Sequence, residues 1–128
     1  MKVLLVADEV WIRNEAIAAL SDPGTVIREV ADPRRASHVA EEFEPDVVIV
    51  DMQVGSMGGM AVARALREAE FADDIPPTSI VLLLDRTADE FLAGRAAADA
   101  WVVKPFTPQQ LRAAITSATA SLAGGLSE

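Results

Sequence analysis

Four charged side chains follow short apolar runs of the sequence, and their spacing gives them a possible chemical role. Asp8 and Glu9 follow KVLLVA, Asp51 follows DVVIV, and Lys104 follows AWVV. If these runs are parallel strands, the side chains that follow them gather at one edge of a sheet, where such sheets bind ligands. Carboxylates and an amine at that edge could together hold a divalent cation and contact an anionic group.

The two aspartates at this edge would need a cation between them or a proton on one of them. Two unit charges about 4 Å apart repel each other by roughly 4 kcal/mol at an effective dielectric near 20. Hard oxygen ligands suit Mg²⁺, which keeps several waters and often joins protein carboxylates to a phosphoryl oxygen. Lys104 adds a positive charge that could neutralise a phosphoryl group. An aspartate beside a metal and a lysine can accept phosphate covalently as an acyl phosphate.

Strands and helices that alternate along the chain must position these side chains. Five apolar runs predict buried strands, at residues 2–7, 25–30, 46–50, 79–84 and 100–103. Helical spacing of apolar residues predicts helices at 11–20, 34–43, 59–70, 88–97 and from Thr107 onward. Thr107 has the character of an N-cap, with Gln110 three residues beyond it.

The order of these elements predicts the fold class. Five alternations of strand and helix indicate an α/β fold with a single doubly wound parallel sheet, in the strand order 2-1-3-4-5, flanked by five helices. Three strands are almost continuously apolar, as strands covered on both faces must be. The strand at 25–30 is more polar, so we place it at an edge. We expect one domain over 1–120 and a flexible tail over 121–128.

Composition excludes several functions. The chain has 128 residues, no cysteine and a formal net charge of −9. Without cysteine there is neither a disulfide nor a thiolate metal site. Direct binding to nucleic acid is not expected, because its affinity comes largely from basic residues that neutralise phosphates. No apolar run approaches the eighteen residues of a membrane span, so we expect a cytoplasmic protein.

The chain resembles a response-regulator receiver domain of two-component signalling over nearly its whole length. The resemblance rests on VLLVADE with Asp8, on Asp51 after DVVIV, on MGGM at 57–60 and on WVVKPF at 101–106. It implies Mg²⁺ held by Asp8, Asp51 and the backbone carbonyl of Gln53, with Glu9 as a further ligand through water. It also implies that Asp51 accepts a phosphoryl group from a histidine kinase or phosphotransfer protein, and that Lys104 contacts this group. The family's Lys-Pro bond is typically cis.

The chain departs from the family pattern at several positions. Ala7 stands where the first of two acids is usual, Gly55 replaces a loop proline, and Gly58 replaces an acid. A Ser or Thr normally ends the fourth strand, whereas this chain has Leu84 there, or Asp85 with a shift of one residue. Leucine cannot bond to a phosphoryl group, and aspartate would repel one. These departures are similar to those of a group of stand-alone actinobacterial regulators.

Two functions therefore stay open. The first is a signalling domain that accepts phosphate on Asp51 and changes its affinity for a downstream protein, with no enzymatic activity beyond its own phosphorylation and dephosphorylation. The alternative is a phosphorylation-independent interaction module that uses the fourth helix, fifth strand and fifth helix, either as a homodimer or against another regulator. A flavin domain is disfavoured because ADEVWIRNE lacks a hydroxyl-rich phosphate loop, and a hydrolase because no serine has a histidine placed to activate it.

Overall fold

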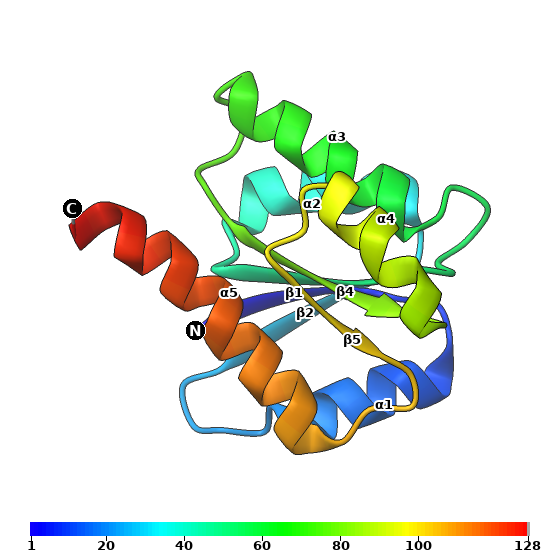
Figure 1. Ribbon diagram of the computed structural model, residues 1–128. Helices are drawn as coiled ribbons and strands as arrows, with labels where there is room; N and C mark the ends of the chain where they lie inside the picture. Colours follow the sequence, from blue (N-terminus) through cyan, green and yellow to red (C-terminus); the bar gives the residue numbers. More distant parts are fainter. Residues whose placement is uncertain (128) are drawn as a thin grey trace.

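A five-stranded parallel sheet forms the centre of the protein (Figure 1). The computed structural model describes residues 1–127, with side chains for residues 1–120. The strands run in the order β2-β1-β3-β4-β5, which confirms the predicted fold and places β2 at an edge. Their bounds are β1 Lys2–Val6, β2 Val26–Val30, β3 Val47–Asp51, β4 Ser79–Leu84 and β5 Ala100–Val103.

Helices cover both faces of the sheet. Helices α2, α3 and α4 lie on one face, and α1 and α5 lie on the other (Figure 1). Their bounds are α1 Val10–Ala19, α2 Ala36–Phe43, α3 Gly59–Phe71, α4 Glu90–Arg95 and α5 Pro108–Ser127. Short 3-10 turns, η1 Pro33–Arg35 and η2 Thr87–Asp89, precede α2 and α4. None of the helices within 1–127 is long and apolar enough to cross a membrane.

Helix α5 begins as the sequence predicts. The amide of Thr107 donates to Oε1 of Gln110 over 2.8 Å, and the amide of Gln110 donates to Oγ1 of Thr107 over 3.1 Å. This reciprocal capping box satisfies two amides at the helix start. The helical backbone continues through 121–127, where we expected a flexible tail. Alanine and leucine in that stretch favour helix despite its two glycines. The domain boundary at residue 120 and the flexible tail beyond it stay predictions.

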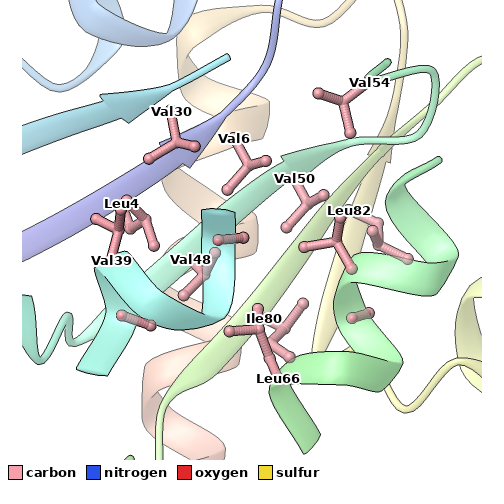
Figure 2. Packing of buried hydrophobic residues seen from close by; sticks show 14 of the residues in the cluster. Leu4, Val6, Val30, Val39, Val48, Val50, Val54, Leu66, Ile80 and Leu82 are labelled. Carbon is pink, nitrogen blue, oxygen red and sulfur yellow. The ribbon is translucent and has the colours of Figure 1, made fainter. Parts of the chain in front are cut away.

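The core is divided by the sheet into two layers, because alternate residues of each strand face opposite sides. Figure 2 shows the layer beneath α2, α3 and α4, where side chains of four neighbouring strands pack together. Within this layer the central strands contribute the fully buried residues Leu4, Val6, Val48, Val50, Ile80 and Leu82. Burying each such side chain contributes about 1.5–3 kcal/mol. The result is a rigid sheet whose strand ends have fixed positions.

The side chain of Val54 anchors the loop after β3 to this core. Val54 is fully buried and points into the layer shown in Figure 2. The carbonyl of Val54 accepts the amide of Gly58 over 3.0 Å, and the carbonyl of Met52 accepts the amide of Gly59 over 2.9 Å. The glycine-rich segment after Asp51 is therefore a compact turn that leads directly into α3.

Candidate functional site

Strand register brings three charged residues to the carboxyl edge of the sheet. Asp51 is the last residue of β3 and pairs with Leu83 of β4, while Leu84 pairs with Val103 of β5. The residues that follow β4 and β5, Asp85 and Lys104, therefore begin side by side. This arrangement is a consequence of parallel strands in fixed register, and it places all three side chains next to one another.

Lys104 links two carboxylates at this edge. Its ammonium donates to Oδ1 of Asp51 and, over 2.8 Å, to Oδ1 of Asp85. The Asp51 side chain is 0% exposed, that of Lys104 is 9% exposed and that of Asp85 is 33% exposed. The lysine and the predicted phosphoacceptor are thus in direct contact and largely shielded from solvent, where charges interact more strongly than in water.

Each carboxylate has one oxygen without a hydrogen-bond partner. In the part of the chain with described side chains, Oδ2 of Asp51 and Oδ2 of Asp85 are buried and accept no hydrogen bond. Oδ1 of Asp51 accepts a second, longer bond from the amide of Gln53, at 3.3 Å. A buried carboxylate oxygen without a partner is unfavourable. Two carboxylates against one ammonium also leave an excess negative charge, so the site is suited to receive a cation or to react as a nucleophile.

The ionisation of the site follows from these contacts. Burial acts to lower the pKa of Lys104, but its hydrogen bonds to Asp51 and Asp85 outweigh burial and raise the pKa above its ordinary 10.5. Burial likewise acts to raise the pKa of Asp85, whereas the hydrogen bond from Lys104 lowers it below its ordinary 3.8. Both groups are therefore charged at neutral pH.

The residues after β1 divide between two environments. Asp8 is exposed, and its Oδ2 accepts the amide of Gly55 over 2.9 Å, which ties it to the loop after Asp51. Oε2 of Glu9 instead accepts the indole N–H of Trp11 over 2.6 Å. Ala7 is buried and offers no ligand. Asp8 therefore lies beside the loop of the candidate site, whereas Glu9 is engaged within the first turn of α1.

A metal at this edge would have few protein ligands. Within the described residues, no three histidine, aspartate or glutamate side chains form a group that could hold an ion. Mg²⁺ does not need such a cage, because it is usually held by one or two carboxylates and keeps several waters. The unpartnered Oδ2 of Asp51 and the exposed carboxylate of Asp8 fit this requirement.

Gly59, the first residue of α3, approaches the site more closely than the sequence indicated. A Cβ at this position would lie 2.5 Å from the carbonyl oxygen of Asp51 and 2.9 Å from Cα of Met52. Both neighbours are backbone atoms, which cannot rotate away. Only glycine allows α3 to start this close to the end of β3. A glycine at a helix start was the available signal, but it could equally have indicated an ordinary cap.

The fifth strand is connected to α4 through an aromatic side chain. The indole N–H of Trp101 donates to Oε2 of Glu90 over 2.8 Å. Trp101 is half-buried and packs against the core layer beneath α4. Helix α4 is only six residues long, shorter than the helix predicted over 88–97, because the 3-10 turn η2 replaces its start.

A doubly wound sheet in this strand order, with a buried aspartate and a lysine in contact at its carboxyl edge, defines the class of receiver-type α/β signalling domains. The family model of the response regulator receiver domain matches residues 3–116. The chain therefore belongs to this family, whose members are signalling proteins that generally use Mg²⁺ for phosphorylation and interact with histidine kinases or phosphotransfer proteins. The Lys104–Pro105 peptide bond is cis, as the resemblance implied.

Individual relatives agree with this assignment. The chain is 33% identical over 114 residues to a probable transcriptional regulator ycf27 of Guillardia theta, with 89% of the chain and 43% of the relative covered. It is 30% identical over 127 residues to the phosphate regulon transcriptional regulatory protein PhoB of Pseudomonas aeruginosa, with 98% and 55% covered. The chain thus spans about half the length of these relatives. It also superposes on the chemotaxis protein CheY4 of Vibrio cholerae with a TM-score of 0.78 and 28% identity, covering 91% of this chain and 97% of that one.

The structure also decides which residue faces the site after β4. The sequence left Leu84 and Asp85 as alternatives for the position where a Ser or Thr is usual. Leu84 is fully buried within β4, whereas the carboxylate of Asp85 contacts Lys104. Asp85 is therefore the residue that faces the lysine. The contact could have been expected from register, since Asp85 and Lys104 each follow directly on a neighbouring strand.

Proposed function

We propose that the chain is a receiver domain that accepts a phosphoryl group on Asp51 and transmits its state through a protein–protein interface. The observation that carries this proposal is the state of Asp51, which is fully buried, pairs with Lys104 through one oxygen and, among the described side chains, has no partner at the other. A carboxylate with a free lone pair, at the edge where parallel sheets bind ligands, is suited to nucleophilic attack.

The reaction can be written from the side chains of this site. Oδ2 of Asp51 attacks the phosphorus of a phosphohistidine on a kinase or phosphotransfer protein, the P–N bond breaks, and the imidazole leaves with its electron pair and takes up a proton. Lys104 keeps its proton throughout and donates hydrogen bonds to the transferred oxygens. Its positive charge offsets the negative charge that phosphoryl transfer gathers at the site.

The proposed Mg²⁺ site uses the residues at the same edge. Asp8, Asp51 and the backbone carbonyl of Gln53 would hold the ion, and Glu9 would join through water if it released Trp11. The ion, when bound, would draw the phosphoryl oxygens toward the site and offset their charge. The excess negative charge of Asp51 and Asp85 over Lys104 supports a cation at this position.

The proposed output is a change in affinity for a downstream protein. The partners would be proteins, because the net charge of −9 opposes contact with nucleic acid. An open groove of about 630 Å³ lies between β5 and α5, lined by Trp101, Val103, Gln110 and their neighbours. Because β5 is an edge strand of the sheet, the face formed by α4, β5 and α5 is the proposed surface for a partner or a second copy.

A second candidate is an interaction module that works without phosphorylation. The position of Asp85 favours it, since this carboxylate already occupies Lys104 and supplies no hydroxyl to a phosphoryl group. In that case the same face would bind its partner regardless of the state of Asp51. The two candidates differ in one measurable property, the dependence of binding on Asp51.

The test combines the protein with Mg²⁺ and acetyl phosphate and measures its intact mass. We expect a gain of one phosphoryl group that disappears in Asp51→Asn and is strongly reduced when Mg²⁺ is chelated. Lys104→Arg should be labelled more slowly, because guanidinium keeps the charge but changes its position. If the wild-type protein gains no phosphate and behaves like Asp51→Asn, phosphate acceptance is rejected and the interaction module is retained.

A further inference from the structure

Lys104 already has two anionic partners before any phosphoryl group arrives. An ammonium offers three N–H donors, and two of them are directed at Oδ1 of Asp51 and Oδ1 of Asp85. A phosphoryl group on Asp51 would carry its negative oxygens toward the same lysine. Asp85 therefore lies where it competes with that group for Lys104.

A neighbouring aspartate, Asp89, holds the turn after β4. Both oxygens of Asp89 accept bonds from Arg86, one from its amide and one from Nη2, each over 3.2 Å, and the Asp89 side chain is 3% exposed. This carboxylate caps the turn that leads into α4. Asp85, by contrast, contacts Lys104 through one oxygen and leaves the other unpartnered among the described side chains. Its interaction is with the site and not with its own turn.

We propose that Asp85 is a built-in anion that holds Lys104 in the resting state and must be displaced when Asp51 accepts a phosphoryl group. The inference rests on the proposed function of Asp51. It assigns Asp85 as a specificity-determining residue, which lowers the reactivity of Asp51 toward anionic donors and their mimics. A hydroxyl at this position would be attracted to a phosphoryl group, whereas the carboxylate of Asp85 is repelled by it.

The geometry also indicates where the displaced side chain would go. Asp85 is already one-third exposed and is followed directly by η2 and α4, so it can turn toward solvent without crossing the core. Glu90 of α4 holds the indole of Trp101. Displacement of Asp85 would therefore act on the segment that carries this contact, and phosphorylation would be transmitted by repulsion.

The experiment removes the charge of Asp85 with little change of shape. Asp85→Asn is compared with wild type and with Asp74→Asn, which removes an equal charge from an exposed residue ahead of β4, at the other end of that strand. Two quantities are measured: the concentration of beryllofluoride that half-saturates the Mg²⁺-loaded protein, followed by tryptophan fluorescence and amide NMR, and the rate of labelling by acetyl phosphate, followed by intact mass. Asp85→Ser serves as a second variant.

We expect Asp85→Asn and Asp85→Ser to bind beryllofluoride at least tenfold more tightly and to be labelled at least tenfold faster. Asp74→Asn should stay within twofold of wild type. A factor of ten corresponds to only about 1.4 kcal/mol, which is less than the interaction of two charges that share one ammonium in a partly buried site. The Lys104 Nζ resonance of the resting protein should also shift in Asp85→Asn and not in Asp74→Asn.

The outcomes separate this inference from the proposed function. If wild type and Asp85→Asn react equally at Asp51, the inference is overturned while phosphate acceptance stands. If only the Asp85 variants react, the inference is supported in its strongest form. If none of them reacts, both proposals fail. An unchanged Lys104 resonance in Asp85→Asn would overturn the resting contact itself.

Discussion

Removing the ammonium of Lys104 should destabilise the protein far more than an ordinary surface substitution. In Lys104→Met, a side chain of similar length would fill the space but leave Asp51 and Asp85 facing each other without a cation. Asp51 is fully buried, so its charge could not be compensated by bulk water. Breaking a buried ion pair by removing one partner typically costs about 3–5 kcal/mol, because an uncompensated charge remains.

The geometry of the site supports a magnitude near the lower end of that range. Two oxygens that bond to the same nitrogen are about 5 Å apart. At that separation and an effective dielectric near 20, two carboxylates repel by about 3 kcal/mol. Asp85 is one-third exposed, so solvent screens part of this repulsion. We therefore expect Lys104→Met to lower the free energy of unfolding by about 3 kcal/mol at pH 7.

Equilibrium urea denaturation, followed by circular dichroism, measures this change. With a slope of about 1–3 kcal/mol per molar urea, the midpoint should fall by about 1–3 M. Lys2→Met is the matched control, since Lys2 is exposed and donates to the carbonyl of Phe43 over 3.0 Å. That control should cost less than about 1 kcal/mol. The double variant Lys104→Met/Asp51→Asn should recover about 2 kcal/mol, because it no longer buries an unpaired carboxylate.

The reasoning would be refuted if Lys104→Met and Lys2→Met had the same small effect. In that event the two carboxylates would not depend on the lysine for their compensation. An absence of recovery in the double variant would contradict the assignment of the loss to Asp51.

Three further predictions concern the same framework. Gly59→Ala should lower the free energy of unfolding by about 1–3 kcal/mol, because its Cβ would meet the carbonyl of Asp51 at 2.5 Å. Gly94→Ala, in an exposed part of a helix, should instead raise the free energy of unfolding by about 0.5–1 kcal/mol. Chemical denaturation of both variants tests this. Arg67→Ala should cost about 2–4 kcal/mol in thermal or urea unfolding, because its guanidinium joins α3 to the carbonyl of Ala97 and to other groups around β4 and β5; a loss as small as a surface substitution would contradict that role. The lowered pKa of Asp85 means that its pairing with Lys104 stabilises the fold above the ordinary 3.8 and is lost as the pH falls through the lower folded value. The stability difference between wild type and Asp85→Asn should therefore be constant near neutral pH and shrink in acid; a constant difference down to the lowest pH reached would count against it.

Sequence patterns were sufficient for most of the fold. Strands that are almost continuously apolar must be buried on both faces, which requires a layer of helices on each side of the sheet. The parallel sheet and its order were predicted from this and from the alternation of strands and helices. The capping box at Thr107 is equally local, since Thr107 and Gln110 interact within one helical turn. Glycine and alanine give opposing signals in 121–127, where the backbone is helical, and the flexible tail over 121–128 stays a prediction.

The candidate site could be predicted only in part. Asp51 and Lys104 were found because each follows an apolar strand, and strand order then placed them at one edge. The role of Asp85 depended on a one-residue shift in the pairing of β4 with its neighbours. The sequence left this shift open, so either Leu84 or Asp85 could have faced the site. Hydrogen bonding of β4 to its neighbours settles that register.

By itself, the sequence determined that the chain forms a doubly wound α/β domain with an aspartate and a lysine at strand ends. The physical basis is that hydrophobic periodicity and the succession of strands and helices can be read along the chain. Only the tertiary structure decided that Lys104 is shared between Asp51 and Asp85, and that α3 begins within contact of the Asp51 backbone. The physical reason is that both features depend on distances between segments far apart in the sequence. Such distances are fixed by sheet register and core packing, which no local pattern of residues records.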